Sequence, residues 1–126
     1  MVEKKILIVD DEEFICDILG EALTNKGYEV RIATNAEEGL DILKKEDIPV
    51  IFLDLNLPGM NGIELCKHIR EKKSRAVIYA VTGYSSLFGV SECKKVGFND
   101  FFTKPVKLKV IFKAAKDAFD NINQSI

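Results

Sequence analysis

The chain has 126 residues, 47% of them hydrophobic and 30% charged, which fits one folded domain with a single core and leaves no room for a second. Its formal net charge of −2 provides no basic field for nucleic acid, so we expect no direct nucleic-acid binding. No apolar run approaches the length of a membrane span or a signal-peptide core, so we expect a cytoplasmic protein without membrane contact.

The first half of the chain alternates short apolar runs with longer segments whose apolar residues recur at helical spacing. Strands are predicted over residues 5–9, 28–33 and 49–53. A helix from Glu12 should end at Gly27, and a second should follow its cap at Asn35. After the loop of residues 55–62, a third helix should turn Ile63, Cys66 and Ile69 inward.

The second half repeats this alternation with one weak element. Strands are predicted over residues 76–81 and 99–103, and a last helix should run from Pro105 with Leu108, Ile111, Phe112, Ala115, Phe119 and Ile122 inward. Residues 85–97 form a poorer helical pattern because Gly89, Val90 and several serines are weak helix formers. We expect this helix to shift easily, although Gly89 alone also fits a simple close-packing role.

Alternating strands and helices predict an α/β fold, a doubly wound parallel sheet with helices on both faces. For five strands the common order is 2-1-3-4-5, which gives a flavodoxin-like three-layer sandwich with its ligand site at the carboxyl ends of the strands. Residues 1–126 should form this single domain with five helices and no attached output domain. Three cysteines, Cys16, Cys66 and Cys93, lack a C-x-x-C pair and should be free core residues.

Polar residues directly follow four of the predicted strands. They should therefore meet at the edge of the sheet formed by the carboxyl ends of the strands: Asp10, Asp11, Asp54, Thr82 and Lys104. Each has an ordinary explanation by itself: Asp10, Asp11 or Thr82 as a helix cap, Asp54 in an Asx turn, and Lys104 as a surface lysine. Helix capping alone would not deliver all of them to one crevice. We therefore interpret them as one site.

Crowded carboxylates repel one another unless protons or a cation are taken up. Few protein ligands with retained waters suit Mg²⁺, which commonly binds carboxylates together with phosphate oxygens. Asp54 is the candidate nucleophile for an aspartyl phosphate, and Asp10 and Asp11 are the candidate metal ligands. Lys104 and the Thr82 hydroxyl would contact the phosphoryl oxygens.

The segments ILIVDDE, IFLDLNLPGMNGIEL, AVTGY and FFTKPV, in this order, resemble the receiver domain of two-component response regulators, particularly the stand-alone chemotaxis-regulator type. The resemblance covers essentially the whole chain. It implies that Asp54 is the phospho-acceptor, that Asp11 binds Mg²⁺ directly and Asp10 largely through water, and that the backbone carbonyl of Asn56 is a third ligand.

The resemblance also implies a switch formed by Thr82, Phe101 and Lys104, with a cis Lys104–Pro105 bond and rearrangement around the fourth helix and fifth strand. The phosphoryl donor would be a histidine kinase or phosphotransfer protein docking near the first helix, and a downstream protein would read the switch. The chain would be a monomer or a phosphorylation-dependent homodimer, and it would catalyse only its own phosphotransfer and dephosphorylation. His68 lies on a predicted helix, so we expect a surface residue and not a donor.

Three alternatives stay open at this point. A haloacid dehalogenase-like phosphatase uses similar groups, but Asn56 stands where its second aspartate belongs, and its acidic pair comes late in the chain. A flavin or dinucleotide binder is disfavoured because no G-x-G-x-x-G follows the first strand. A receiver used only as a scaffold is disfavoured by the full set of site residues.

Tyr84 departs from the family pattern and is predicted to shield an acyl phosphate from water.

Overall fold

The computed structural model describes residues 3–83 and 89–124. Strands and helices alternate along this part of the chain, and each strand is followed by a helix. The elements are β1 (Lys5–Val9), α1 (Glu13–Asn25), β2 (Glu29–Ala33), α2 (Ala36–Lys45), β3 (Val50–Leu53), α3 (Gly62–Lys72), β4 (Val77–Thr82), α4 (Val90–Val96), β5 (Asp100–Thr103) and α5 (Leu108–Gln124).

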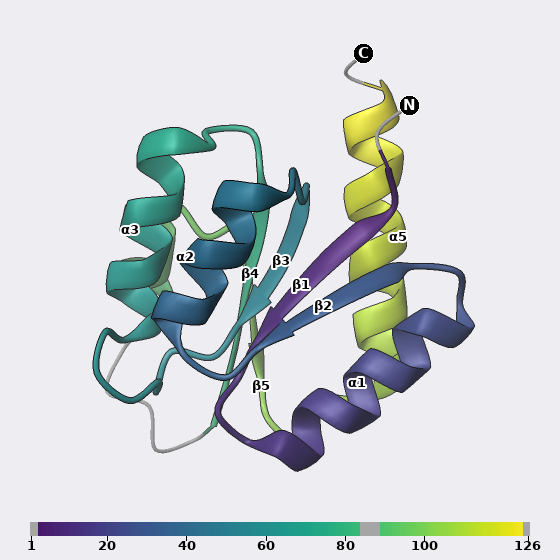
Figure 1. The fold of residues 1–126 in the computed structure, drawn as a ribbon, viewed down its shortest axis with the longest axis horizontal. Helices are drawn as coiled ribbons and strands as arrows, with labels where there is room; N and C mark the ends of the chain where they lie inside the picture. The colour runs from purple at the N-terminus through teal and green to yellow at the C-terminus, as the bar shows by residue number, and fades with distance from the viewer. Residues whose placement is uncertain (1–2, 84–88, 125–126) are drawn as a thin grey trace.

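The sheet is parallel throughout and has the order β2-β1-β3-β4-β5, as predicted. Alternate side chains of β1 enter different cores, because successive residues of a strand point to opposite faces. Leu7 and Val9 pack with α2, α3 and α4 on one face, whereas Ile6 and Ile8 pack with α1 and α5 on the other. Figure 1 shows the resulting layers, with α2 and α3 on one side of the sheet and α1 and α5 on the opposite side.

The apolar patterns locate the helices correctly but do not assign every apolar residue to the core. On α1, Cys16, Leu19 and Leu23 are buried, while the Phe14 and Ile18 side chains are 71% and 38% exposed. A helix packed on one side of a sheet can bury only one stripe, so extra apolar residues remain in solvent. These two side chains form an exposed apolar patch on α1.

The last helix begins three residues later than the sequence predicts. Val106 packs against the core shared with α1, so the chain is held there before the helix starts. The first helical contacts run from the N–H groups of Val110 and Ile111 to the carbonyl of Lys107. The expected inward position of Leu108 is also wrong, since Leu108 is 38% exposed.

The weak fourth helix is short. Only Val90–Val96 is helical within the described part of the predicted 85–97 segment, and Gly97 ends it with φ of 110°. The Arg70 guanidinium joins this end to α3, because its Nε and Nη2 atoms donate to the Gly97 carbonyl at 2.9 and 2.7 Å. Tyr84 lies outside the described residues.

Other predictions about single residues are confirmed. Cys16, Cys66 and Cys93 are free and buried, His68 is exposed on α3, and the Asn35 side chain caps α2 by accepting from the Glu38 N–H. Within residues 3–83 and 89–124, none of the helices combines the length and the hydropathy that a membrane-spanning segment requires.

Candidate functional site

The sheet ladder continues beyond the ends of the strands and aligns the candidate residues. The Asp10 N–H donates to the Ala33 carbonyl at 3.1 Å, and the Asp54 N–H donates to the Val9 carbonyl at 2.9 Å. The Lys104 N–H donates to the Thr82 carbonyl at 2.7 Å. Because β1, β3, β4 and β5 are neighbours in this order, Asp10, Asp54, Thr82 and Lys104 occupy successive places along one edge.

Lys104 is the centre of an ionic cluster at that edge. Its Nζ atom lies 2.8 Å from Asp10 Oδ2, 3.1 Å from Asp54 Oδ2 and 3.2 Å from Glu12 Oε1. The Asp10, Asp54 and Lys104 side chains are only 5%, 6% and 14% exposed, whereas that of Glu12 is 59% exposed. The ordinary surface-lysine interpretation of Lys104 is therefore wrong.

The electrostatics reflect crowding of charge in a partly desolvated place. Burial raises the pKa of the Asp10 carboxyl, and Lys104 and the Glu12 N–H offset this only in part. Burial acts to lower the pKa of the Lys104 ammonium, but bonding and attraction to Asp10, with a further contribution from Asp54, raise it above its ordinary value. Lys104 thus remains a cation among the acids.

The segment after Asp54 is held tightly. The Asn56 N–H donates to Asp54 Oδ1 at 3.0 Å, which is the bond of the Asx turn considered for this residue. Gly62, the first residue of α3, lies so close that a Cβ there would contact the Asp54 carbonyl and come within 2.7 Å of Leu55 Cα. Leu55 is fully buried. Glycine at position 62 therefore lets α3 pack directly against the Asp54 backbone.

Three carboxylates gather where a cation can bind. Oxygen atoms of Asp10, Glu12 and Asp54 lie within 4.8 Å of one another. Hard carboxylate oxygens at this spacing fit a hard divalent ion such as Mg²⁺. Asp11, the direct ligand expected from the resemblance, is exposed and outside this group.

Glu12 is the residue that sequence reasoning missed. The signal was present, because the apolar strand is followed by three acids in a row, DDE. Asp10 Oδ1 accepts from the Glu12 N–H at 2.9 Å, and this local turn brings Glu12 back toward Lys104. The helix dipole favours an acid at the start of a helix, so Glu12 has an ordinary explanation in the sequence. Its position alone therefore did not assign it to the site.

The proposed switch residues lie next to this cluster. Thr82 is fully buried, and its Oγ1 accepts from Asn56 Nδ2 at 3.2 Å. Phe101 is half-buried against the core that contains α2, α3 and α4. The Lys104–Pro105 bond is cis, as the resemblance implied.

Comparisons with known proteins agree with this geometry. The response regulator receiver domain family matches residues 6–116. The chain is 35% identical over 116 residues to sporulation initiation phosphotransferase F of Bacillus subtilis (strain 168), covering 92% of this chain and 94% of that protein. It spans less than half the length of several other curated relatives that it matches.

Solved structures give the same result. A CheY-like response regulator receiver domain protein from Methanospirillum hungatei JF-1 superimposes with a TM-score of 0.93 at 32% identity, over 99% of this chain and 100% of that one. The beryllofluoride-activated NtrC4 receiver domain dimer, a solution structure, gives 0.87 at 30% identity, over 94% and 98%. The chain belongs to the family of response regulator receiver domains.

Proposed function

We propose that this receiver domain is a phosphorylation-dependent switch that accepts a phosphoryl group on Asp54 from a histidine kinase or phosphotransfer protein. The observation that carries the proposal is the buried Asp54 carboxylate, 3.1 Å from the Lys104 ammonium and grouped with Asp10 and Glu12. A carboxylate held between a lysine and a cation site is suited to nucleophilic attack on phosphorus.

In the proposed transfer, an Asp54 carboxylate oxygen forms a bond to phosphorus while the bond from phosphorus to the donor's histidine nitrogen breaks. The electron pair returns to that nitrogen, and an aspartyl phosphate results. Lys104 would move its contact from the free carboxylate to a phosphoryl oxygen, where a charge-assisted bond is strong. The Thr82 hydroxyl would donate to another phosphoryl oxygen.

Asp10, Glu12 and Asp54 are the described residues that would hold Mg²⁺ through carboxylate oxygens, with Asp11 and the Asn56 carbonyl as further candidates from the family resemblance. Bound Mg²⁺ would supply positive charge to the phosphoryl oxygens and orient them for in-line transfer. Without that charge, the negative acids and the incoming phosphoryl group would repel one another.

For output, we propose that movement of Thr82 lets Phe101 turn inward and changes the face around α4 and β5, which a partner protein reads. The low helix propensity of residues 85–97 supports a small free-energy difference between the two states. The beryllofluoride-activated relative is a dimer, which supports a phosphorylation-dependent homodimer as one form of output. The proposed switch would act in the cytoplasm.

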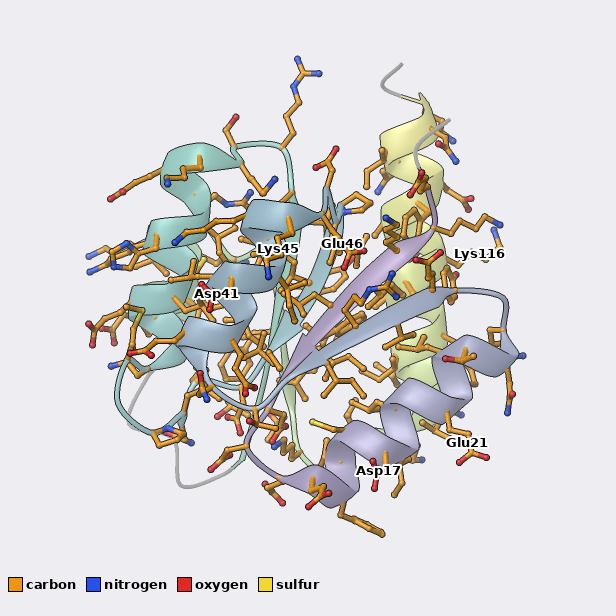
Figure 2. All side chains as sticks on the ribbon, in the orientation of Figure 1. Asp17, Glu21, Asp41, Lys45, Glu46 and Lys116 are labelled. Atoms are coloured by element: carbon orange, nitrogen blue, oxygen red, sulfur yellow. The ribbon has the colours of Figure 1, made fainter. Side chains whose placement is uncertain are left out.

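Support for a protein donor comes from α1. Phe14 and Ile18 are exposed one turn apart, and Asp17 and Glu21 project outward from the same helix (Figure 2). An apolar patch flanked by acids fits a partner helix surface with apolar and basic residues. The relative from Bacillus subtilis carries the name of a phosphotransferase, which is consistent with exchange of phosphoryl groups between proteins.

The proposed reaction can be tested with acetyl phosphate and Mg²⁺, which require no partner protein. The intact mass of the native chain should rise by one phosphoryl group, and the mass of Asp54→Ala should stay unchanged. Catalytic turnover of a generic phosphate ester would instead favour a haloacid dehalogenase-like phosphatase. An unchanged mass of the folded native chain would favour a scaffold without phosphorylation.

A further inference from the structure

Asn56 contacts two functional groups of the site at once. Its backbone N–H donates to Asp54 Oδ1 at 3.0 Å, and its side-chain Nδ2 donates to Thr82 Oγ1 at 3.2 Å. The first bond belongs to the turn after β3, while the second crosses to the end of β4, so Asn56 links the proposed acceptor to the proposed switch hydroxyl.

We propose that Asn56 is a positioning residue whose side-chain amide holds the Thr82 hydroxyl in the resting state and so sets how readily the domain switches. The inference rests on the proposed function, because it assumes that Thr82 moves when a phosphoryl group occupies Asp54. It assigns the Asn56 side chain a role separate from the metal contact that the resemblance gives to its backbone carbonyl.

The burial of the two partners makes the bond asymmetric. Thr82 is fully buried, so its hydroxyl oxygen cannot exchange the Asn56 donor freely for bulk water. Asn56 itself is exposed, and its amide is readily rehydrated when the bond breaks. Loss of the bond to the Asn56 amide therefore costs the buried Thr82 hydroxyl more free energy than it costs the exposed Asn56 side chain.

The bond biases the switch only if it is lost on activation. In the proposed active state the Thr82 hydroxyl turns to a phosphoryl oxygen, and the amide returns to solvent. An interaction present in one state alone shifts the equilibrium toward that state by its full net free energy. Replacement of Asn56 by alanine should therefore favour the active state by roughly three- to tenfold.

Alanine is the informative replacement because it preserves the rest of the turn. The Asn56 N–H to Asp54 bond and the Asn56 carbonyl both belong to the backbone, so neither is removed. The exposed side chain leaves no cavity behind it. Asn56→Asp would add a negative charge beside Asp54, so its effect on the site's electrostatics could not be separated from the loss of the amide.

Beryllofluoride, a phosphoryl mimic that cannot be hydrolysed, provides the main test at saturating Mg²⁺. Asn56→Ala should bind it roughly three- to tenfold more tightly than the native chain. In a Thr82→Ala background the same replacement should change the affinity little, because its partner is gone. Equal affinity in native and Asn56→Ala proteins, or the same gain in both backgrounds, would overturn the inference.

A second measurement needs no phosphoryl mimic. In the free protein, NMR couplings should report one preferred χ1 rotamer for Thr82, and Asn56→Ala should give rotamer averaging. Asn25→Ala, a replacement of another exposed asparagine at the end of α1, should change neither quantity. An unaltered Thr82 rotamer in Asn56→Ala contradicts the positioning role, whereas failure of the native chain to bind beryllofluoride contradicts the proposed function.

Discussion

Asp10 is nearly inaccessible to solvent and nonetheless carries a carboxylate whose pKa is raised by burial. Its bonds to Lys104 and to the Glu12 N–H compensate only part of the cost of desolvation. The folded state therefore prefers this side chain neutral more than the unfolded state does. Residues kept at such a cost are typical of sites where function opposes stability.

Replacement Asp10→Asn should raise the free energy of unfolding at neutral pH, because the relief of the buried charge should outweigh the loss of its attraction to Lys104. Asparagine retains an oxygen for the Glu12 N–H but removes the buried charge, and Lys104 keeps its contacts with Asp54 and Glu12. Urea unfolding checks the stability, and a Mg²⁺ titration of the folded variant should show weaker binding. A less stable variant with unchanged Mg²⁺ affinity would contradict this account.

Single residues of the site were only partly predictable from the sequence. Strand ends identified Asp10, Asp54, Thr82 and Lys104, because polar residues after apolar runs in a parallel sheet must meet at one edge. The choice among Asp10, Asp11 and Glu12 depends on how the chain turns after β1, and composition does not determine this turn. The Asn56 to Thr82 bond was equally hidden, since it joins the loop after β3 to the last residue of β4, 26 positions further along the chain.

At the scale of elements, β4 and α5 are joined by a buried tyrosine. The Tyr79 hydroxyl donates to the Ala114 carbonyl at 3.0 Å, and its ring lies between Phe52 and Phe102, with centroids at 5.1 and 5.5 Å. Burial raises the pKa of Tyr79 to about 12. The neutral Tyr79 hydroxyl, through its bond to Ala114, therefore helps to hold α5 on the sheet.

This pKa predicts how stability changes in alkaline solution. In the unfolded chain a tyrosine ionises near pH 10, so its neutral form stabilises the fold fully below that pH. The contribution should be lost as the pH rises from about 10 to about 12. Urea unfolding should show a steeper loss for the native chain than for Tyr79→Phe, which lacks the ionising group; equal slopes would refute the assignment.

Element boundaries were less predictable than element types. The sequence predicts that α5 starts at Pro105, because proline favours the first turn of a helix, but the helix begins at Leu108. Val106 packs against the core, and these contacts compete with the local preference for helix. Because they involve residues distant in sequence, local patterns do not reveal them. For the same reason, the exposure of Phe14 on α1 could not be read from helical spacing alone.

At the scale of the whole molecule, the fold separates the acceptor from the surface that would select its donor. Asp54 lies at the end of the central strand β3, whereas Phe14 lies on α1. The order of the strands was predictable because parallel crossovers leave few arrangements. The partner was not, because no residue pattern encodes which protein carries complementary groups.

Phe14→Ala should therefore separate protein donors from small ones. With a phosphorylated histidine kinase that phosphorylates the native chain, transfer should slow by roughly tenfold, since an exposed aromatic anchor is lost. Phosphorylation by acetyl phosphate should be unchanged. His68→Ala, which removes an exposed ring from α3 on the opposite side of the sheet, is the matched control. Equal slowing with both donors would mean that Phe14 acts on the site itself and not on docking.

The position of the phosphoryl group on the chain can be measured directly. After reaction with acetyl phosphate and Mg²⁺, borohydride cleaves an acyl phosphate by reducing its carbonyl carbon to an alcohol, and peptide mass spectrometry identifies the altered residue. Reduction should occur at Asp54 alone, and it should be lost when a chelator removes Mg²⁺. Reduction at another acid, or equal reduction at Asp54 with the chelator present, would contradict the proposed Mg²⁺-dependent phosphorylation of Asp54.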